Sequence, residues 1–123
     1  MNVLIDTNVI IDVLVQRKPF FEHSQLVLLA SEQKLINGFV SATAVTDIFY
    51  VVRKHYNKAD AHELMKKHLI GTVSVAAVDE YAILKALEME WNDFEDCVQY
   101  VVSENISADY IVTRNPKDFQ MKI

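Results

Sequence analysis

The sequence predicts an α/β fold: a three-layer α/β/α sandwich in which a central parallel sheet is covered by helices on both faces. Short apolar runs such as Val3-Leu4-Ile5 are typical of strands that are buried on both sides. Longer segments with apolar residues at helical spacing separate these runs, and such alternation favours parallel pairing. With 123 residues, few glycines and prolines, and no repeat or linker, the chain is expected to form one domain, 1–123.

Composition excludes several classes of protein. Cys97 is the single cysteine, so an internal disulfide or a thiolate zinc cluster is ruled out and a cytoplasmic location is expected. No charged-then-apolar leader and no apolar run of membrane-spanning length is visible. The net charge of −5 argues against broad electrostatic binding of nucleic acid, but it leaves room for a nuclease whose metal ions supply positive charge.

The first strand, Val3–Ile5, is followed directly by Asp6. A carboxylate is thereby placed at the carboxyl end of a parallel strand, the edge where such sheets bind ligands, although Asp6 could be a simple turn residue. Asn8 is expected to cap the first helix. The basic break Arg17-Lys18-Pro19 precedes a second helix, expected from Phe20 to Lys34. Its cations are either solvated or in contact with a polyanionic substrate.

The middle of the chain repeats the change from strand to helix. A helix stop at Asn37-Gly38 precedes a strand at Phe39–Ser41, and an apolar stripe marks a helix from Ala42 to Tyr56. Asp47 lies in the first turns of that helix and is expected on the same rim as Asp6, unless it is an ordinary surface residue. Three further elements are expected: a helix over Asn57–Ile70, a weak strand at Val73–Val75 and a helix from Asp79 to Met89.

Three carboxylates, Asp93, Glu95 and Asp96, fall within four consecutive positions where the next helix is predicted to start. Such close like charges repel, and a helix amino terminus offsets only about 0.3–1 kcal/mol per surface acid. A divalent cation would offset far more, because magnesium and manganese bind carboxylate oxygens. The alternative is that Asp93 simply caps the helix, with Asp96 three positions on.

The last predicted strand, Asp109–Val112, is expected to be buried and parallel. It ends in Thr113-Arg114-Asn115-Pro116-Lys117-Asp118, in which Asn115 can cap a final helix and Asp118 can occupy its third position. Capping alone explains part of this pattern. Carboxylates nevertheless arrive at one edge of the sheet from several separate segments, so we expect them to converge on one crevice.

Four segments taken in order resemble the PIN-domain family: Leu4–Val9, Thr46-Asp47, Asp93–Asp96 and Ile111–Phe119. The resemblance runs from end to end and is greatest to the small VapC-type toxins of bacterial toxin–antitoxin pairs. It implies an endoribonuclease that depends on Mg²⁺ or Mn²⁺ and is usually a homodimer. It also implies a cognate antitoxin protein that covers the acidic crevice.

The resemblance assigns roles to individual residues. The catalytic acids would be Asp6, Asp47, Asp96 and Asp118. The metal would be held by Asp6, Asp96, Asp93 and Asp47. Supporting hydrogen bonds would come from Asn8, Thr113 and Asn115, and contacts to RNA phosphates are expected from Arg114, Arg17 and Lys18. Asp47 departs from the Glu found in many members of the family and is one methylene shorter, which leaves its direct coordination open.

Two other interpretations compete with a nuclease. A PIN fold can act as a catalytically idle binding module. A phosphoacceptor receiver domain has similar length and a parallel sheet, but it needs a second acid beside Asp6 and a lysine on the last strand, where this chain has Thr113-Arg114.

Overall fold

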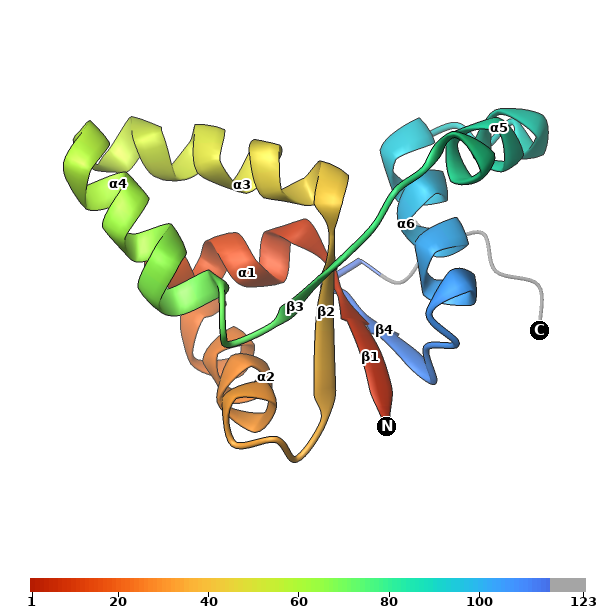
Figure 1. The fold of residues 1–123 in the computed structure, drawn as a ribbon. Coiled ribbons are helices and arrows are strands. Elements are labelled where there is room, and N and C mark those ends of the chain that lie inside the picture. Colours follow the sequence, from red (N-terminus) through yellow and green to blue (C-terminus); the bar gives the residue numbers. More distant parts are fainter. Residues whose placement is uncertain (116–123) are drawn as a thin grey trace.

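A computed structural model describes residues 1–115 and contains a four-stranded, fully parallel sheet (Figure 1). Its strands are β1 (Asn2–Ile5), β2 (Asn37–Ser41), β3 (Ser74–Ala76) and β4 (Tyr110–Val112), in the spatial order β3-β2-β1-β4. Its α-helices are α1 (Thr7–Leu14), α2 (Phe21–Glu32), α3 (Ala42–His55), α4 (Lys58–Leu64), α5 (Glu80–Met89) and α6 (Phe94–Asn105). A π-helical turn, η1 (Met65–Leu69), continues α4. The predicted fold class is confirmed.

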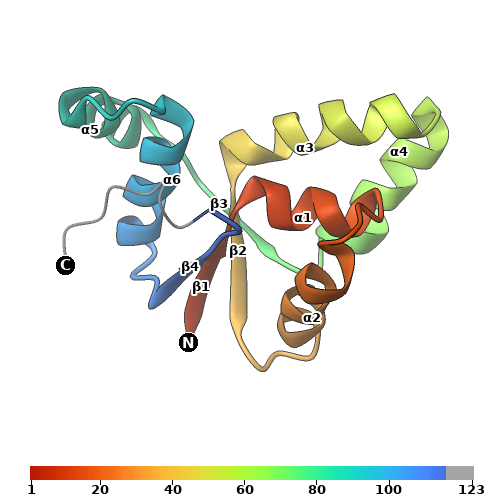
Figure 2. The same cartoon turned by 180° about the vertical axis from the view of Figure 1, so that it is seen from behind.

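Each face of the sheet carries its own apolar core, because successive side chains along a strand point to opposite faces. Val3 and Ile5 of β1 pack with α1 to α4, whereas Leu4 packs with α5 and α6. Figure 1 shows these two groups of helices on opposite sides of the sheet, and Figure 2 shows the same layers from behind. The inner strand β1 is therefore covered on both faces, as its apolar sequence predicts. No helix in the described part of the chain is long and apolar enough to cross a membrane.

Three expectations about individual elements are wrong. Asn8 does not cap α1, because the chain stays extended only to Asp6, whose N–H donates to Val112 O at 2.9 Å, and the helix begins at Thr7. Asn37-Gly38 does not stop a helix; both residues lie inside β2, where Gly38 pairs with Val3. β4 is not fully buried, because it forms an edge of the sheet, and Tyr110 is 62% exposed.

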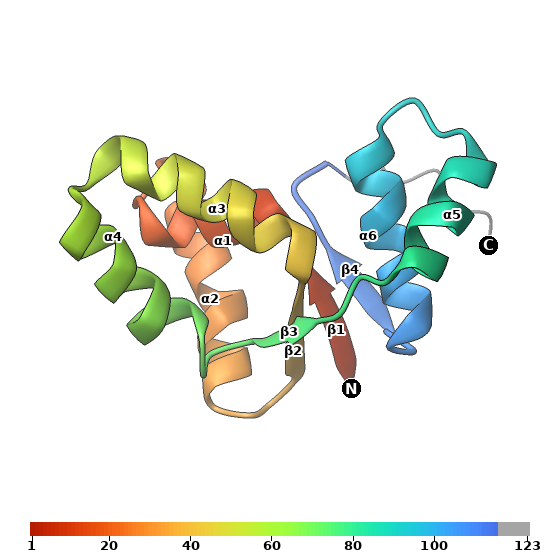
Figure 3. The same ribbon diagram turned by 45° about the horizontal axis from the view of Figure 1, so that its top comes forward.

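The predicted helices over the rest of the described chain are confirmed, with ends close to those expected. Asp79 caps α5 by accepting from Ala82 N at 2.9 Å. The weak strand expected at Val73–Val75 is β3, one residue further along. The amino-terminal ends of α3 and α6 lie at the same edge of the sheet as the carboxyl end of β1 (Figure 3).

Helix α2 packs so closely on β2 that glycine is required at position 38. A Cβ atom at this position would lie 2.9 Å from Ser31 Cβ and 3.2 Å from Ile5 Cδ1. Ser31 is held in place because its Oγ donates to Thr72 O at 2.5 Å. The neighbouring side chain therefore has little freedom to move away.

Gly38→Ala should lower the free energy of unfolding by about 1–3 kcal/mol, because the added methyl group overlaps the Ser31 side chain. Urea denaturation followed by circular dichroism measures this change. The double variant with Ser31→Gly should lose less stability than the sum of the two single variants. Strictly additive losses would contradict the proposed steric cause.

Candidate active site at the carboxyl edge of the sheet

Asp6 follows β1 directly and is a buried carboxylate, with 6% of the residue exposed. Its Oδ1 accepts a hydrogen bond from Gln99 Nε2 at 3.1 Å, and its Oδ2 accepts one from Thr113 Oγ1 at 2.8 Å. These donors offset part of the cost of removing the charge from water. Because a carboxylate oxygen can accept two hydrogen bonds, each oxygen retains capacity for a further partner.

The segment after β4 brings Thr113 and Asn115 to this carboxylate. Thr113 Oγ1 donates to Asp6 and accepts from the Asn115 N–H at 3.1 Å. The hydroxyl therefore has a fixed direction. Of the three predicted supporting residues, Thr113 contacts Asp6 directly, and Asn115 is linked to Asp6 through the bond from its backbone N–H to Thr113. Asn8 lies in the first turn of α1.

Helix α6 opens at the acidic stretch that stands out in the sequence. Asp93 is its N-cap and accepts from the Asp96 N–H at 3.0 Å, so the capping role is real whatever else this residue does. Asp96 and Glu95 precede Gln99 by about one turn of the same helix and lie on its side of α6. Since Gln99 reaches Asp6, this side of the helix faces the end of β1.

Asp47 on α3 meets α6 through Glu95. Burial, followed by a hydrogen bond with Asp47 and the charge of Asp47, raises the pKa of Glu95 to about 7, and the charges of Asp93 and Asp96 contribute in the same direction. Two carboxyl groups on different helices therefore contact each other. We call the set Asp6, Asp47, Glu95 and Asp96 the acidic edge. Glu95 is absent from the residues predicted for the site, although it belongs to the acidic stretch.

Sequence reasoning also missed Asp12, a fully buried carboxylate on α1 that lies beside the segment carrying Thr113. Ser24 Oγ donates to its Oδ2 at 3.0 Å, and Arg114 Nε lies 2.9 Å from the same oxygen. The Nε–H is not aligned with an acceptor, so this contact is an ion pair without a well-formed hydrogen bond. The signal in the sequence is a single acid among the apolar residues of the first helix.

The three cations expected at RNA phosphates have different surroundings. Arg114 is paired with Asp12, and its guanidinium lies over the Phe20 ring at 3.8 Å from the centroid. Arg17 Nη1 lies 3.8 Å from Asp12 Oδ1, while Lys18 is exposed in the loop between α1 and α2. Two of the three therefore have an anionic partner within the protein.

The chemistry of the donor set suits a hard divalent cation, because it consists of carboxylate oxygens. Within residues 1–115, however, no three His, Cys, Asp or Glu side chains already form a group that could hold a metal ion. The fourth expected acid, Asp118, lies outside the described residues, so its role stays a prediction. The contact between Asp47 and Glu95 is one that a proton or a cation would relieve.

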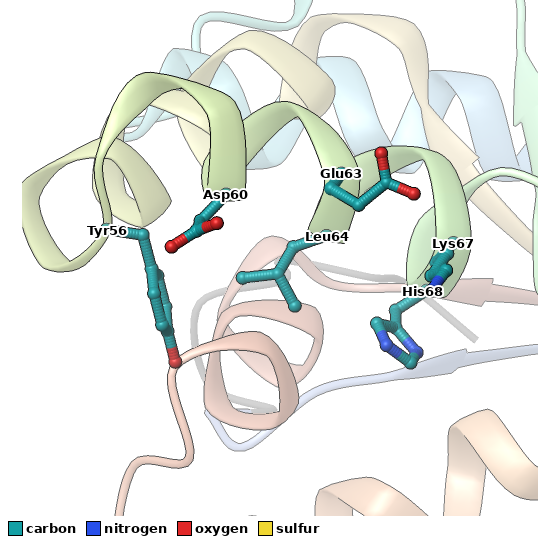
Figure 4. Close-up of a pocket in the computed structure, with 6 residues that line it drawn as sticks. All are labelled: Tyr56, Asp60, Glu63, Leu64, Lys67 and His68. Atoms are coloured by element: carbon teal, nitrogen blue, oxygen red, sulfur yellow. The ribbon is translucent and has the colours of Figure 1, made fainter.

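An open pocket lies elsewhere, along α4 and η1 (Figure 4). Its volume is about 290 Å³, and it is lined by Tyr56, Asp60, Glu63, Leu64, Lys67 and His68. None of the residues predicted for the site lines it. The pocket is therefore separate from the acidic edge.

Comparison with known proteins gives matches that span most of the chain. Residues 2–117 match the family model described as PIN domain. Ribonuclease VapC1 of Aquifex aeolicus is 26% identical over 125 residues, which cover 95% of this chain and 83% of the relative. The crystal structure of VapC20 of Mycobacterium tuberculosis, described as a sarcin–ricin loop cleaving toxin, superposes with a TM-score of 0.76 at 11% identity, covering 94% of this chain and 92% of the other.

Arg114→Met should lower the free energy of unfolding by about 3 kcal/mol, because it leaves the buried Asp12 charge without its nearest cation. Urea denaturation at neutral pH measures the loss. Arg53→Met is the matched control, since Arg53 is exposed and its Nη1 donates to a backbone oxygen, Tyr56 O, at 3.3 Å. If Arg114→Met and Arg53→Met lower the free energy of unfolding by the same small amount, the ion pair contributes nothing to stability.

The metal-free protein should become less stable as the pH rises through the titration of Glu95. The pKa of Glu95 is raised from 4.5 to about 7 on folding, so its stabilising contribution is complete below pH 4.5 and is lost as the pH passes about 7. Glu95→Gln should remove this part of the decline, whereas Glu88→Gln on the surface of α5 should leave it unchanged. Urea midpoints between pH 5 and 8 in chelator, identical for wild type and Glu95→Gln, would contradict the assignment.

Proposed function

We propose, from the premise that this chain belongs to the PIN-domain family, that it is an endoribonuclease that hydrolyses RNA phosphodiester bonds. The family membership predicted from the sequence is confirmed by the match over residues 2–117. The observation that carries the proposal is the buried Asp6 carboxylate, held by two donors at the carboxyl end of the inner strand β1. The relatives named a ribonuclease and a sarcin–ricin loop cleaving toxin support the same activity.

The proposed cofactor is Mg²⁺ or Mn²⁺, with Asp6, Asp96, Asp93 and Asp47 as the residues that would hold it. A bound cation would polarise the phosphodiester and lower the pKa of an attacking water. Asp93 also caps α6, because its Oδ1 accepts from the Asp96 N–H. Any contribution of Asp93 to the metal site would therefore be made alongside this cap. Glu95 brings a further carboxyl group to the same edge through its contact with Asp47.

The residues of the chain have separate tasks in this proposal. Asp6 has a fixed orientation, so it can present its remaining lone pairs without reorganisation. Asp47, Asp96 and Asp118 are proposed as the other catalytic acids, and Asn8, Thr113 and Asn115 as residues that orient acids or water. Lys18, Arg17 and Arg114 are the proposed contacts to RNA phosphates; their positive charge offsets repulsion between an acidic protein and its substrate.

The toxin of a type II toxin–antitoxin pair is the proposed biological setting. VapC20, which is described as a toxin, supports this setting, and the Aquifex aeolicus ribonuclease shares the VapC name. The proposed partners are therefore an RNA substrate, a cognate antitoxin protein and a second copy of this chain, and the proposed location is the cytoplasm. Membership of the PIN-domain family rules out the phosphoacceptor receiver domain, and a catalytically idle binding module is the remaining rival.

Asp6→Asn and Asp96→Asn should each reduce cleavage of a structured RNA pool by on the order of 100-fold, because each removes a carboxylate charge proposed to hold the cation that would stabilise the reacting phosphate. Cleavage by purified protein should be compared with magnesium, with manganese and with chelator. Asp60→Asn, on the exposed side of α4, is the matched control and should cut as the wild type does. An uncut pool under every metal, together with no magnesium binding by calorimetry, would leave the idle binding module.

A further inference from the structure

We propose that Gln99 is a positioning residue of the candidate active site, which fixes the orientation of the Asp6 carboxylate from α6. Gln99 is 1% exposed and is the largest polar side chain among the fully buried ones in the described chain. Its Nε2 donates to Asp6 Oδ1 at 3.1 Å across 93 positions of sequence. Neither the predicted site nor the roles drawn from the family resemblance includes it. The consequence for catalysis rests on the proposed function, whereas the geometry stands by itself.

The chemistry of the two groups determines which end of the amide faces Asp6. An ionised carboxylate only accepts hydrogen bonds, so the NH₂ group of Gln99 must point toward it. The carbonyl oxygen of Gln99 then points the other way, and it is buried without a hydrogen-bond partner in the described chain. An apolar side chain of similar length would avoid burying that unpaired acceptor. The donor at Asp6 is what a glutamine supplies and an apolar residue does not.

Two donors on different oxygens constrain Asp6 more than either does alone. Gln99 holds Oδ1 from α6, and Thr113 holds Oδ2 from the segment after β4. The terminal torsion of an aspartate is otherwise broad, so these bonds select one plane for the carboxylate. Gln99 also lies one turn after Glu95 and Asp96, so the same bond links the acid that follows β1 to the helix that carries these two acids.

Gln99→Met tests the inference, because methionine keeps the length of the side chain and removes the amide, and with it the donor to Asp6 and the unpaired buried oxygen. Residues that orient metal ligands typically change metal affinity by 10–100-fold, so Mn²⁺ should bind this variant at least about 10-fold more weakly in calorimetry. Ser103→Ala is the matched control, since Ser103 is buried one turn further along α6 and its Oγ donates to Tyr100 O at 2.6 Å, within the same helix. Wild-type Mn²⁺ affinity in folded Gln99→Met would overturn the inference.

A second variant and a second readout cover the other outcomes. If Gln99→Met does not fold, Gln99→Asn retains the amide but is too short to reach Asp6, and it should weaken Mn²⁺ binding equally. If wild-type protein binds no Mn²⁺, the proposed metal dependence fails and the positioning role is judged on urea midpoints of the metal-free protein. Gln99→Met combined with Asp6→Asn should then shift the midpoint by less than the two single shifts together. Additive shifts would show that Gln99 does not act through Asp6.

Discussion

Burial of the Asp6 charge at the end of β1 is the constraint on which the rest of the site depends. β1 is one of the two inner strands and is covered on both faces, so the residue that follows it cannot keep a full hydration shell. The charge is tolerated because Gln99 and Thr113 donate to its two oxygens. One donor belongs to the helical layer on one face, and the other follows the edge strand. The site therefore exists only when α6 and β4 have both docked on β1.

Asp12 is a second buried carboxylate that is compensated by partners within the protein, and it lies in the helical layer on the opposite face of the sheet. Asp12 lies on α1 and is approached by Arg114, whereas the preceding residue, Thr113, is directed to Asp6. Two consecutive residues after β4 thus reach two buried carboxylates of the β1–α1 unit. This double attachment fixes the start of the carboxyl-terminal segment, and it explains why an arginine expected to meet substrate is in contact with an internal acid.

The parts of this structure that follow from local pattern could be predicted, and the parts that depend on distant partners could not. Alternation of apolar runs and helical stripes gives the layers, and the position of Asp6 follows from the end of the first strand. Gln99 and Asp12 each interrupt an apolar helix face, but a sequence does not say which buried donor or cation compensates them. Asn37-Gly38 resembles a turn locally, and only close packing against Ser31 explains glycine inside β2.

Repulsion between carboxylates of the acidic edge affects both the stability of the fold and the proposed binding of a cation. Asp47 and Glu95 approach each other from different helices, and the pKa of Glu95 is raised first by its burial and then by the hydrogen bond and the negative charge of Asp47. A proton on Glu95 relieves the repulsion, and a divalent cation would relieve it at the same oxygens. Protons and metal would then compete for one set of carboxylates, so metal affinity would fall at acid pH. An RNA phosphate approaching the metal-free edge meets the same charges. The arrangement that weakens the empty fold is therefore the one that would make cation and substrate bind together.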